Sequence, residues 1–150
     1  MTTFKDRLES DLHAAMKSRD ELTTSTLRMA LAAVRTEEVS GKAARTLTDD
    51  EVLAVLKRET KKRREAAAAF ADAGRTEQAE RERAEEGVLE TYLPKQLSDD
   101  ELAAIVTEAL AGLDLTGRSA LGPAMKAANA AVAGRAEGGR VAAVVRGRLG

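Results

Sequence analysis

The residues that could do chemistry in this chain are few, and their spacing does not assemble a reactive site. His13 is the only histidine and cysteine is absent, so neither a Ser-His-Asp triad nor a polyhistidine metal site can be built. Glu9 lies four residues before His13 on one predicted helix, which suits a metal pair, yet no further ligand cluster accompanies it. A solvated surface pair is the favoured interpretation. We therefore expect no catalytic residue, no metal site and no cofactor.

Two acidic pairs and one glycine-rich segment also have structural explanations. The pairs Asp49/Asp50 and Asp99/Asp100 fall in the first turns of predicted helices, where the helix dipole favours carboxylates. The segment GRAEGG begins at Gly134 and follows no predicted strand, so neither a Rossmann nor a Walker context applies. We interpret it as the end of one helix and the start of another, with Gly134 in the left-handed conformation.

A run of six cations in eight residues is the densest charge feature. A helical wheel places five of them outward as a basic patch and puts Arg63 on the apolar stripe of the same helix. If the chain turns back at Gly74, Arg63 faces Glu85, and we predict an ion pair between Arg63 and Glu85 or Glu86. The acidic return helix favours charge pairing over a nucleic-acid patch. The five outward cations are Lys57, Arg58, Lys61, Lys62 and Arg64.

The elements that position these residues are predicted to be helices throughout. Alanine, leucine, glutamate, lysine and arginine dominate, aromatic residues contribute 2%, and strand signals are scarce, which predicts an all-α fold. The first helix, capped by Thr2 or Thr3, should end near Arg19, and the second, capped by Asp20, should end near Ser40. Met16 and Val39 are among their apolar positions. The next two, from Thr48 to Ala73 and from a cap at Thr76 to Leu93, should form a long antiparallel hairpin.

The segment from Val88 to Leu102 marks a boundary between two helical parts. Pro94 disfavours helix at the residue before it, and Ser98 with Glu101 forms a capping box that opens the next helix. We predict an N-terminal helical bundle over residues 1–93, a linker over 94–97 and a small C-terminal three-helix tail domain over 98–150. Ser119 is the predicted cap of the middle tail helix.

The tail carries a basic excess. From Leu115 to Gly150, six cations stand against Glu137 alone, and we expect no acidic helix beside them. The tail is therefore a better nucleic-acid candidate than the denser run upstream. The candidate RNA-binding residues are Arg118, Lys126, Arg135, Arg140 and Arg146.

Composition also bears on where the protein works. The chain lacks cysteine, its first residues lack the apolar core of a signal peptide, and no apolar run of 18 residues occurs. We expect a cytoplasmic protein with no membrane segment.

Five segments together carry a resemblance to a known family. They occur in order along nearly the whole chain, and YLPKQLS, within the third of them, is a specific signature. The segments are LRMALAAV from Leu27, LTDDEVLAVLKRETKKRRE from Leu47, VLETYLPKQLSDDEL from Val88, GPAMKAAN from Gly122 and GRAEGGRVAAVV from Gly134. On these residues the chain resembles the GatB/YqeY family.

This resemblance implies a function without catalysis. The tail would be similar to the C-terminal part of the B subunit of the glutamine-dependent aspartyl/glutamyl-tRNA amidotransferase, which contacts tRNA. Glutamine hydrolysis and amide transfer belong to other parts of that enzyme, so an amidotransferase (carbon–nitrogen ligase) label would be inherited without the chemistry. The resemblance thus implies an accessory module in tRNA binding or tRNA metabolism, with tRNA or another folded RNA as its partner. The alternative is a protein-interaction module that docks through the alanine-rich faces of residues 66–73 or 124–133.

Overall fold

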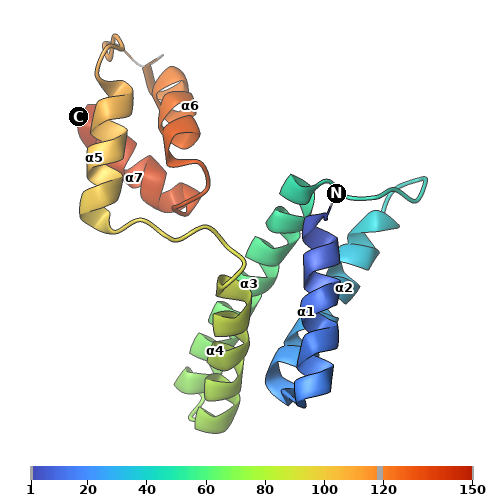
Figure 1. The fold of residues 1–150 in the computed structure, drawn as a ribbon. Coiled ribbons are helices and arrows are strands. Elements are labelled where there is room, and N and C mark those ends of the chain that lie inside the picture. Colours follow the sequence, from blue (N-terminus) through green and yellow to red (C-terminus); the bar gives the residue numbers. More distant parts are fainter. Residues whose placement is uncertain (1, 118–119, 150) are drawn as a thin grey trace. The chain divides into compact units, whose positions relative to one another are not determined.

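All regular secondary structure of the protein is helical in the ranges that the computed structural model describes, residues 2–117 and 120–149 (Figure 1). This confirms the predicted all-α class. The chain divides into two compact units, residues 1–93 and 94–150, and each is described by itself. None of the described helices is both long enough and apolar enough to cross a membrane.

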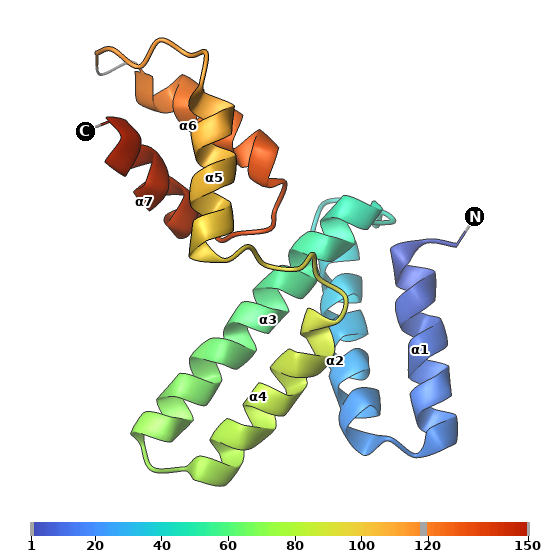
Figure 2. The same cartoon turned by 60° about the vertical axis from the view of Figure 1, so that its left-hand side comes forward.

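The N-terminal unit is built from two helical pairs. They are α1 (Phe4–Ser18) with α2 (Glu21–Glu38), and α3 (Asp49–Asp72) with α4 (Thr76–Glu90). The helices of each pair run antiparallel, as Figures 1 and 2 both show. Their shared core is aliphatic, as the scarcity of aromatic residues requires. Its largest fully buried side chains are those of Leu8, Leu27, Leu31, Val34, Val52, Leu56 and Leu89.

Side-chain caps begin the first three helices. Thr3 and Thr48 each accept a hydrogen bond from the third residue of the helix that follows, whose carboxylate bonds back to the cap, and Asp20 accepts from the Thr23 N–H. These three predicted starts are confirmed. Capping matters here because each cap satisfies amide groups that the helix itself leaves without partners.

The fourth helix begins and ends differently from the prediction. Thr76 was wrongly predicted to be its cap: Arg75 occupies that position and makes no side-chain cap hydrogen bond. The reason is that Gly74 adopts φ 75°, which lets the Arg75 N–H reach the Phe70 carbonyl at 2.8 Å. The predicted end at Leu93 was also too late, because the last amides before Pro94 bond three residues back in tighter turns.

Two apolar side chains predicted to face the core are exposed instead. Val39 is 65% exposed and Met16 is 46% exposed. Val39 follows the last residue of α2, and five residues at 100° each turn its side chain about 140° away from Val34, so it lies off the buried face. Met16 lies about 100° round α1 from Ala15, which takes the buried position.

The C-terminal unit has a core of its own. The described helices there are α5 (Asp99–Leu110), α6 (Leu121–Val132) and α7 (Gly138–Leu149). The predicted capping box of Ser98 and Glu101 is confirmed at the start of α5. Ser119 lies outside the described residues, and Ala120 precedes α6 without a side-chain cap. The core consists of Leu97, Leu102, Val106, Leu110, Ala124, Ala128, Val132, Val141 and Val145.

Leu97 belongs to this second core rather than to a free linker. Its side chain is buried, and its N–H donates to the Arg135 carbonyl at 2.8 Å. The predicted linker of residues 94–97 therefore extends one residue too far, because Leu97 is already part of the C-terminal unit.

A matched pair of valine substitutions on α2 tests the core assignment. Val34 is fully buried, so Val34→Ala should lower the free energy of unfolding by about 2 kcal/mol, whereas Val39→Ala should change it by less than about 0.5 kcal/mol. Urea unfolding followed by circular dichroism measures both. Equal losses in the two variants would contradict the burial described here.

Candidate nucleic-acid interface

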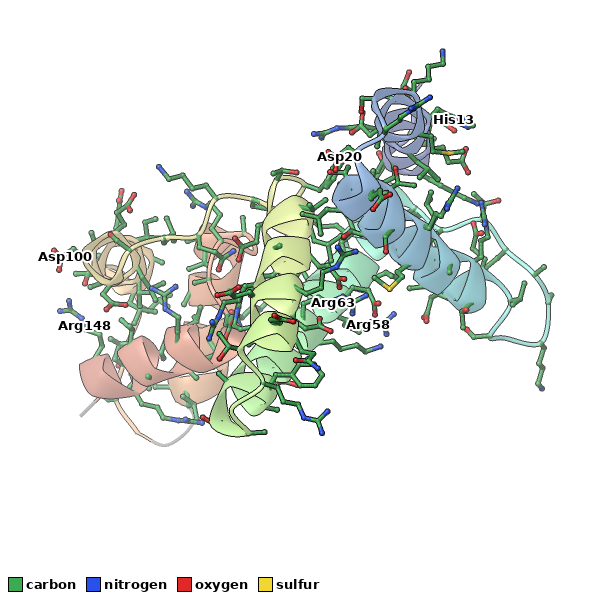
Figure 3. The ribbon with its side chains drawn as sticks, turned by 90° about the horizontal axis from the view of Figure 1, so that it is seen from below. His13, Asp20, Arg58, Arg63, Asp100 and Arg148 are labelled. Carbon is green, nitrogen blue, oxygen red and sulfur yellow. The ribbon has the colours of Figure 1, made fainter. Side chains whose placement is uncertain are left out.

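Charge in the C-terminal unit is separated between its helices. Four carboxylates and no cations lie on α5, whereas α6 and α7 carry four cations and no carboxylates. The expectation that no acidic helix lies beside the basic tail was wrong, because α5 packs against both α6 and α7. A charge count that begins at Leu115 leaves α5 out. In Figure 3, Asp100 of α5 and Arg148 of α7 both extend from the edge of the unit.

Arg140 ties α7 to the start of α5. One of its Nη atoms donates to the Leu97 carbonyl at 2.8 Å and to Asp99 Oδ1 at 3.0 Å. The side chain is half-buried. Arg140 therefore has a structural role, because it holds α7 to the start of α5.

Arg135 has a similar structural task at the end of α6. Its Nε donates to the Val132 carbonyl and one Nη to the Ala131 carbonyl, both at 2.9 Å. These carbonyls are among the last of the helix, where the chain passes through left-handed geometry at Ala133 (φ 51°) and Gly134 (φ 78°). The left-handed conformation predicted for Gly134 is confirmed. Arg135 therefore supplies hydrogen-bond donors to carbonyl groups that have no partner within the end of the helix.

Lys126 and Arg146 are the candidate RNA-binding residues whose side chains remain available. Both are exposed, and neither makes a hydrogen bond or an ion pair within the ranges that the structure describes. Lys126 lies about 200° round α6 from the buried Ala124, so it faces away from the core. Arg148, which was not selected from the sequence, is equally exposed and lacks a described partner. Arg118 lies outside the described residues.

The cations of the run on α3 are matched by carboxylates of the same unit. Lys57 is half-buried and also interacts with the protein. Arg58, which Figure 3 shows beside α2, reaches Glu37 of that helix. The closest nitrogen–oxygen distances are 3.2 Å for Arg58–Glu37, 4.0 Å for Lys61–Glu65, 3.0 Å for Lys62–Glu59 and 3.1 Å for Arg64–Glu86. The predicted secondary basic patch is thus a balanced surface.

Arg63 occupies the centre of a buried ionic cluster between α3 and α4. Its Nε lies 3.1 Å from Glu85 Oε2 and 3.8 Å from Glu82 Oε2, and one Nη lies 3.7 Å from Glu59 Oε1. The Arg63 side chain is only 12% exposed and that of Glu85 only 9%. The buried position of Glu59 was not recognised in the sequence, although its spacing of four residues from Arg63 could have indicated a pair.

Two of the three carboxylates in the cluster have a second cation beside them, Lys62 at 3.0 Å from Glu59 and Arg81 at 3.1 Å from Glu85. Arg81 donates to Glu85 at 3.1 Å, which leaves Glu82 with only the longer approach to Arg63. Burial raises the pKa of Glu82, the nearby Glu85 carboxylate adds to this, and Arg63 and Arg81 act in the opposite direction. Arg63 Nε and Glu82 Oε2 are both buried without a hydrogen-bond partner, an arrangement that costs free energy.

A second polar contact, at Tyr92, joins the end of α4 to α1. The Tyr92 hydroxyl donates to Asp11 Oδ2 at 2.6 Å, and the Arg7 guanidinium lies 4.8 Å from the ring centroid. Burial and this hydrogen bond raise the pKa of the hydroxyl. An open hollow of about 390 Å³ nearby is lined by both signs of charge, including Arg7, Asp11 and Asp49. No local sequence signal pairs Tyr92 with a residue 81 positions away.

These side chains form no reactive constellation. Within the described ranges, no three histidine, aspartate or glutamate side chains lie close enough to hold a metal ion. His13 extends from α1 into solvent (Figure 3). What the arrangement offers is exposed positive charge on α6 and α7.

Comparison with known proteins agrees with the resemblance found in the sequence. A family model described as "Yqey-like protein" matches residues 5–149. A protein of Schizosaccharomyces pombe, itself described as uncharacterized, is 36% identical over 86 residues, which amount to 57% of this chain and 68% of that protein.

Removing the central cation of the buried cluster should be costly. Arg63→Met leaves Glu82 with no described cation within 4.0 Å and leaves Glu59 and Glu85 with only Lys62 and Arg81, so we expect the free energy of unfolding to fall by about 3 kcal/mol. Lys61→Met is the control on the same helix, because its ion pair is exposed, and it should cost less than about 1 kcal/mol. Urea unfolding of both variants is the measurement, and similar midpoints would disprove the role given to Arg63.

The raised pKa of Glu82 predicts the sign of a pH effect. Because the folded state holds the proton more tightly than the unfolded state, Glu82 favours folding below its ordinary pKa and loses this contribution as pH rises through the raised value. Glu82→Gln should therefore stabilise the protein at neutral pH and match the wild type in acid.

Glu38→Gln provides the opposite case. A hydrogen bond from Lys5 lowers the pKa of Glu38, so this variant should be destabilised at neutral pH, with the difference lost in acid. Thermal unfolding between pH 3 and 8 compares the two variants. If both variants were stabilised at neutral pH, or both destabilised, the direction of the pKa shift given to Glu82 or to Glu38 would be wrong.

Proposed function

This chain belongs to the YqeY-like protein family, and from that membership we propose that it is a non-catalytic accessory module that binds tRNA or another folded RNA through its C-terminal unit. The observation that carries the proposal is the set of exposed cations on α6 and α7 without a partner among the described residues. They are Lys126, Arg146 and Arg148. Cations of this kind supply the phosphate contacts on which most nucleic-acid affinity depends.

The separation of charge in this unit indicates which of its faces an RNA would approach. Phosphates approaching α6 and α7 meet cations, whereas those approaching the outer face of α5 meet Asp100 and Glu108, both of which are exposed. The favourable approach is therefore on the α6–α7 side. Arg135 and Arg140 also remain proposed phosphate contacts. They would use the guanidinium N–H groups that make no hydrogen bond within the unit.

A folded RNA suits this surface better than a single strand. Rigid helices can recognise the shape and phosphates of an A-form duplex, whose major groove is too narrow for side chains to read. Single-strand binding instead uses aromatic side chains as stacking platforms. Phe4 and Tyr92 pack against the N-terminal core with their rings 6.3 Å apart, and Phe70 is half-buried.

The proposal assigns no amide transfer to the chain itself. A label of glutamine-dependent amidotransferase would rest on the resemblance to the B subunit alone, and the purified protein should release no ammonia from glutamine above the level of a buffer blank.

The second candidate function is protein docking through alanine-rich faces. On α6 that face is largely used, because Ala124 and Ala128 are buried in the core of the unit. On α3, Ala68, Ala69 and Ala71 are exposed and remain candidates. Affinity capture from lysate with and without ribonuclease separates the two functions: tRNA that disappears with ribonuclease favours RNA binding, and a protein partner that survives it favours docking.

The RNA proposal predicts a specific salt dependence. The logarithm of tRNA affinity should fall linearly with the logarithm of salt concentration, and a variant with both Lys126→Ala and Arg146→Ala should reduce that slope by about two, one for each lost phosphate contact. Fluorescence anisotropy with labelled tRNA between 50 and 200 mM salt is the measurement.

The control is a double variant with Arg75→Ala and Arg83→Ala. It removes the same charge from exposed residues of the N-terminal unit that have no described side-chain partner. Its slope should stay close to that of the wild type. Equal slopes in the tail variant and the control, or no measurable binding at all, would refute RNA binding through the tail.

A further inference from the structure

The outer face of α2 carries two arginines that the N-terminal unit does not use. Arg28 and Arg35 are exposed, and neither makes a side-chain hydrogen bond or an ion pair within 4.0 Å in the described part of the chain. At 100° per residue they share one stripe of the helix with Ala32, and the residue that follows the helix, Val39, is exposed as Ala32 is. This distinguishes them from the run on α3, whose exposed cations are matched by carboxylates.

The carboxylates near Arg28 and Arg35 are either paired with another cation or lie on the neighbouring helix α1. Glu38, the acid closest to Arg35 along the helix, accepts from Lys5 of α1 at 2.9 Å, and Arg35 acts on it only through its longer-range field. The contact of Lys5 with Glu38 sets the register of α1 against α2, which puts Glu9 near the level of Arg35 and Met16 near that of Arg28. Glu9 is half-buried and forms no described ion pair. The stripe therefore keeps a net positive charge.

We propose that Arg28 and Arg35 form a second RNA-binding surface, which contacts phosphates of a structured RNA from the N-terminal unit. Seven residues separate the two side chains, or about 10 Å along the helix, so each can meet a different phosphate. The guanidinium presents a fork of donors that matches phosphate oxygens and keeps its charge at any physiological pH. This inference rests on the proposed RNA partner but not on the tail residues assigned to it.

The composition of the stripe favours phosphate over a protein partner. Protein interfaces depend on large buried anchors, typically aromatic, at their centre. Between Arg28 and Arg35 the stripe has only the methyl group of Ala32, and Val39 lies at the end of the helix. The free energy available there comes from the two charges.

Labelled tRNA and anisotropy titrations test this surface directly. A variant with Arg28→Ala and Arg35→Ala should reduce the salt slope by about two relative to the wild type. The double variant Arg75→Ala and Arg83→Ala removes equal charge elsewhere in the same unit and should leave the slope unchanged. Glu9→Gln, which removes the carboxylate of α1 near the level of Arg35 that forms no described ion pair, should strengthen binding at low salt.

The outcomes separate this surface from the tail. If only the α2 variant weakens binding, the α2 surface stands and the tail assignment fails; if only the tail variant Lys126→Ala with Arg146→Ala does so, the α2 surface is rejected. Losses in both variants support both surfaces. An α2 variant that behaves like the Arg75 and Arg83 control, or a wild type that binds no tRNA, overturns the inference. Melting curves by circular dichroism confirm that each variant is folded.

Discussion

The buried guanidinium of Arg63 is the interaction on which the hairpin of the N-terminal unit depends. Beyond Leu56 and Leu89, the apolar side chains buried between α3 and α4 are mainly alanines such as Ala67 and Ala79. Alanine contacts remove little surface from water, so they supply little free energy. Arg63 meets Glu59, Glu82 and Glu85 in that thin interface. Loss of that charge would leave Glu82 with no described cation within 4.0 Å and would take one of two partners from Glu59 and from Glu85, so the hairpin depends on it.

That constraint also determines which charges remain for a partner. The exposed cations beside Arg63 on α3 have carboxylate partners on α2, α3 and α4, so the densest basic run offers little net field. Exposed cations with no described partner lie elsewhere in the chain, and those proposed to contact RNA are on α2, α6 and α7. A partner with closely spaced phosphates is attracted by such net charge rather than by the number of cations in a segment. The distribution of pairs, more than composition, is therefore the reason that the proposed RNA contacts lie outside the run.

How much of this was predictable can be seen at individual residues. The caps at Thr3, Asp20, Thr48 and Ser98 follow from local chemistry, because a cap and its helix lie within four residues, and they are present in the structure. Arg63 was placed opposite Glu85 by counting back from Gly74, and the two are 3.1 Å apart. The structural roles of Arg135 and Arg140 were missed, because most of their partners are backbone carbonyls, which carry no sequence signal, and Asp99 lies 41 residues from Arg140. Pairing of Tyr92 with Asp11 was missed because the two are far apart in the chain.

By itself, the sequence determined the helices, most of their ends, the positions of the core stripes and the family of the chain. These properties depend on neighbours within one or two turns, or on residue order, and both are written directly in the sequence. Only the tertiary structure decided which charged side chains form ion pairs within the protein. Ion pairing acts over about 4 Å in space, so it depends on how helices distant in sequence are packed together. Packing placed the acidic α5 against the basic α6 and α7, and it left Arg28, Arg35, Lys126 and Arg146 facing solvent.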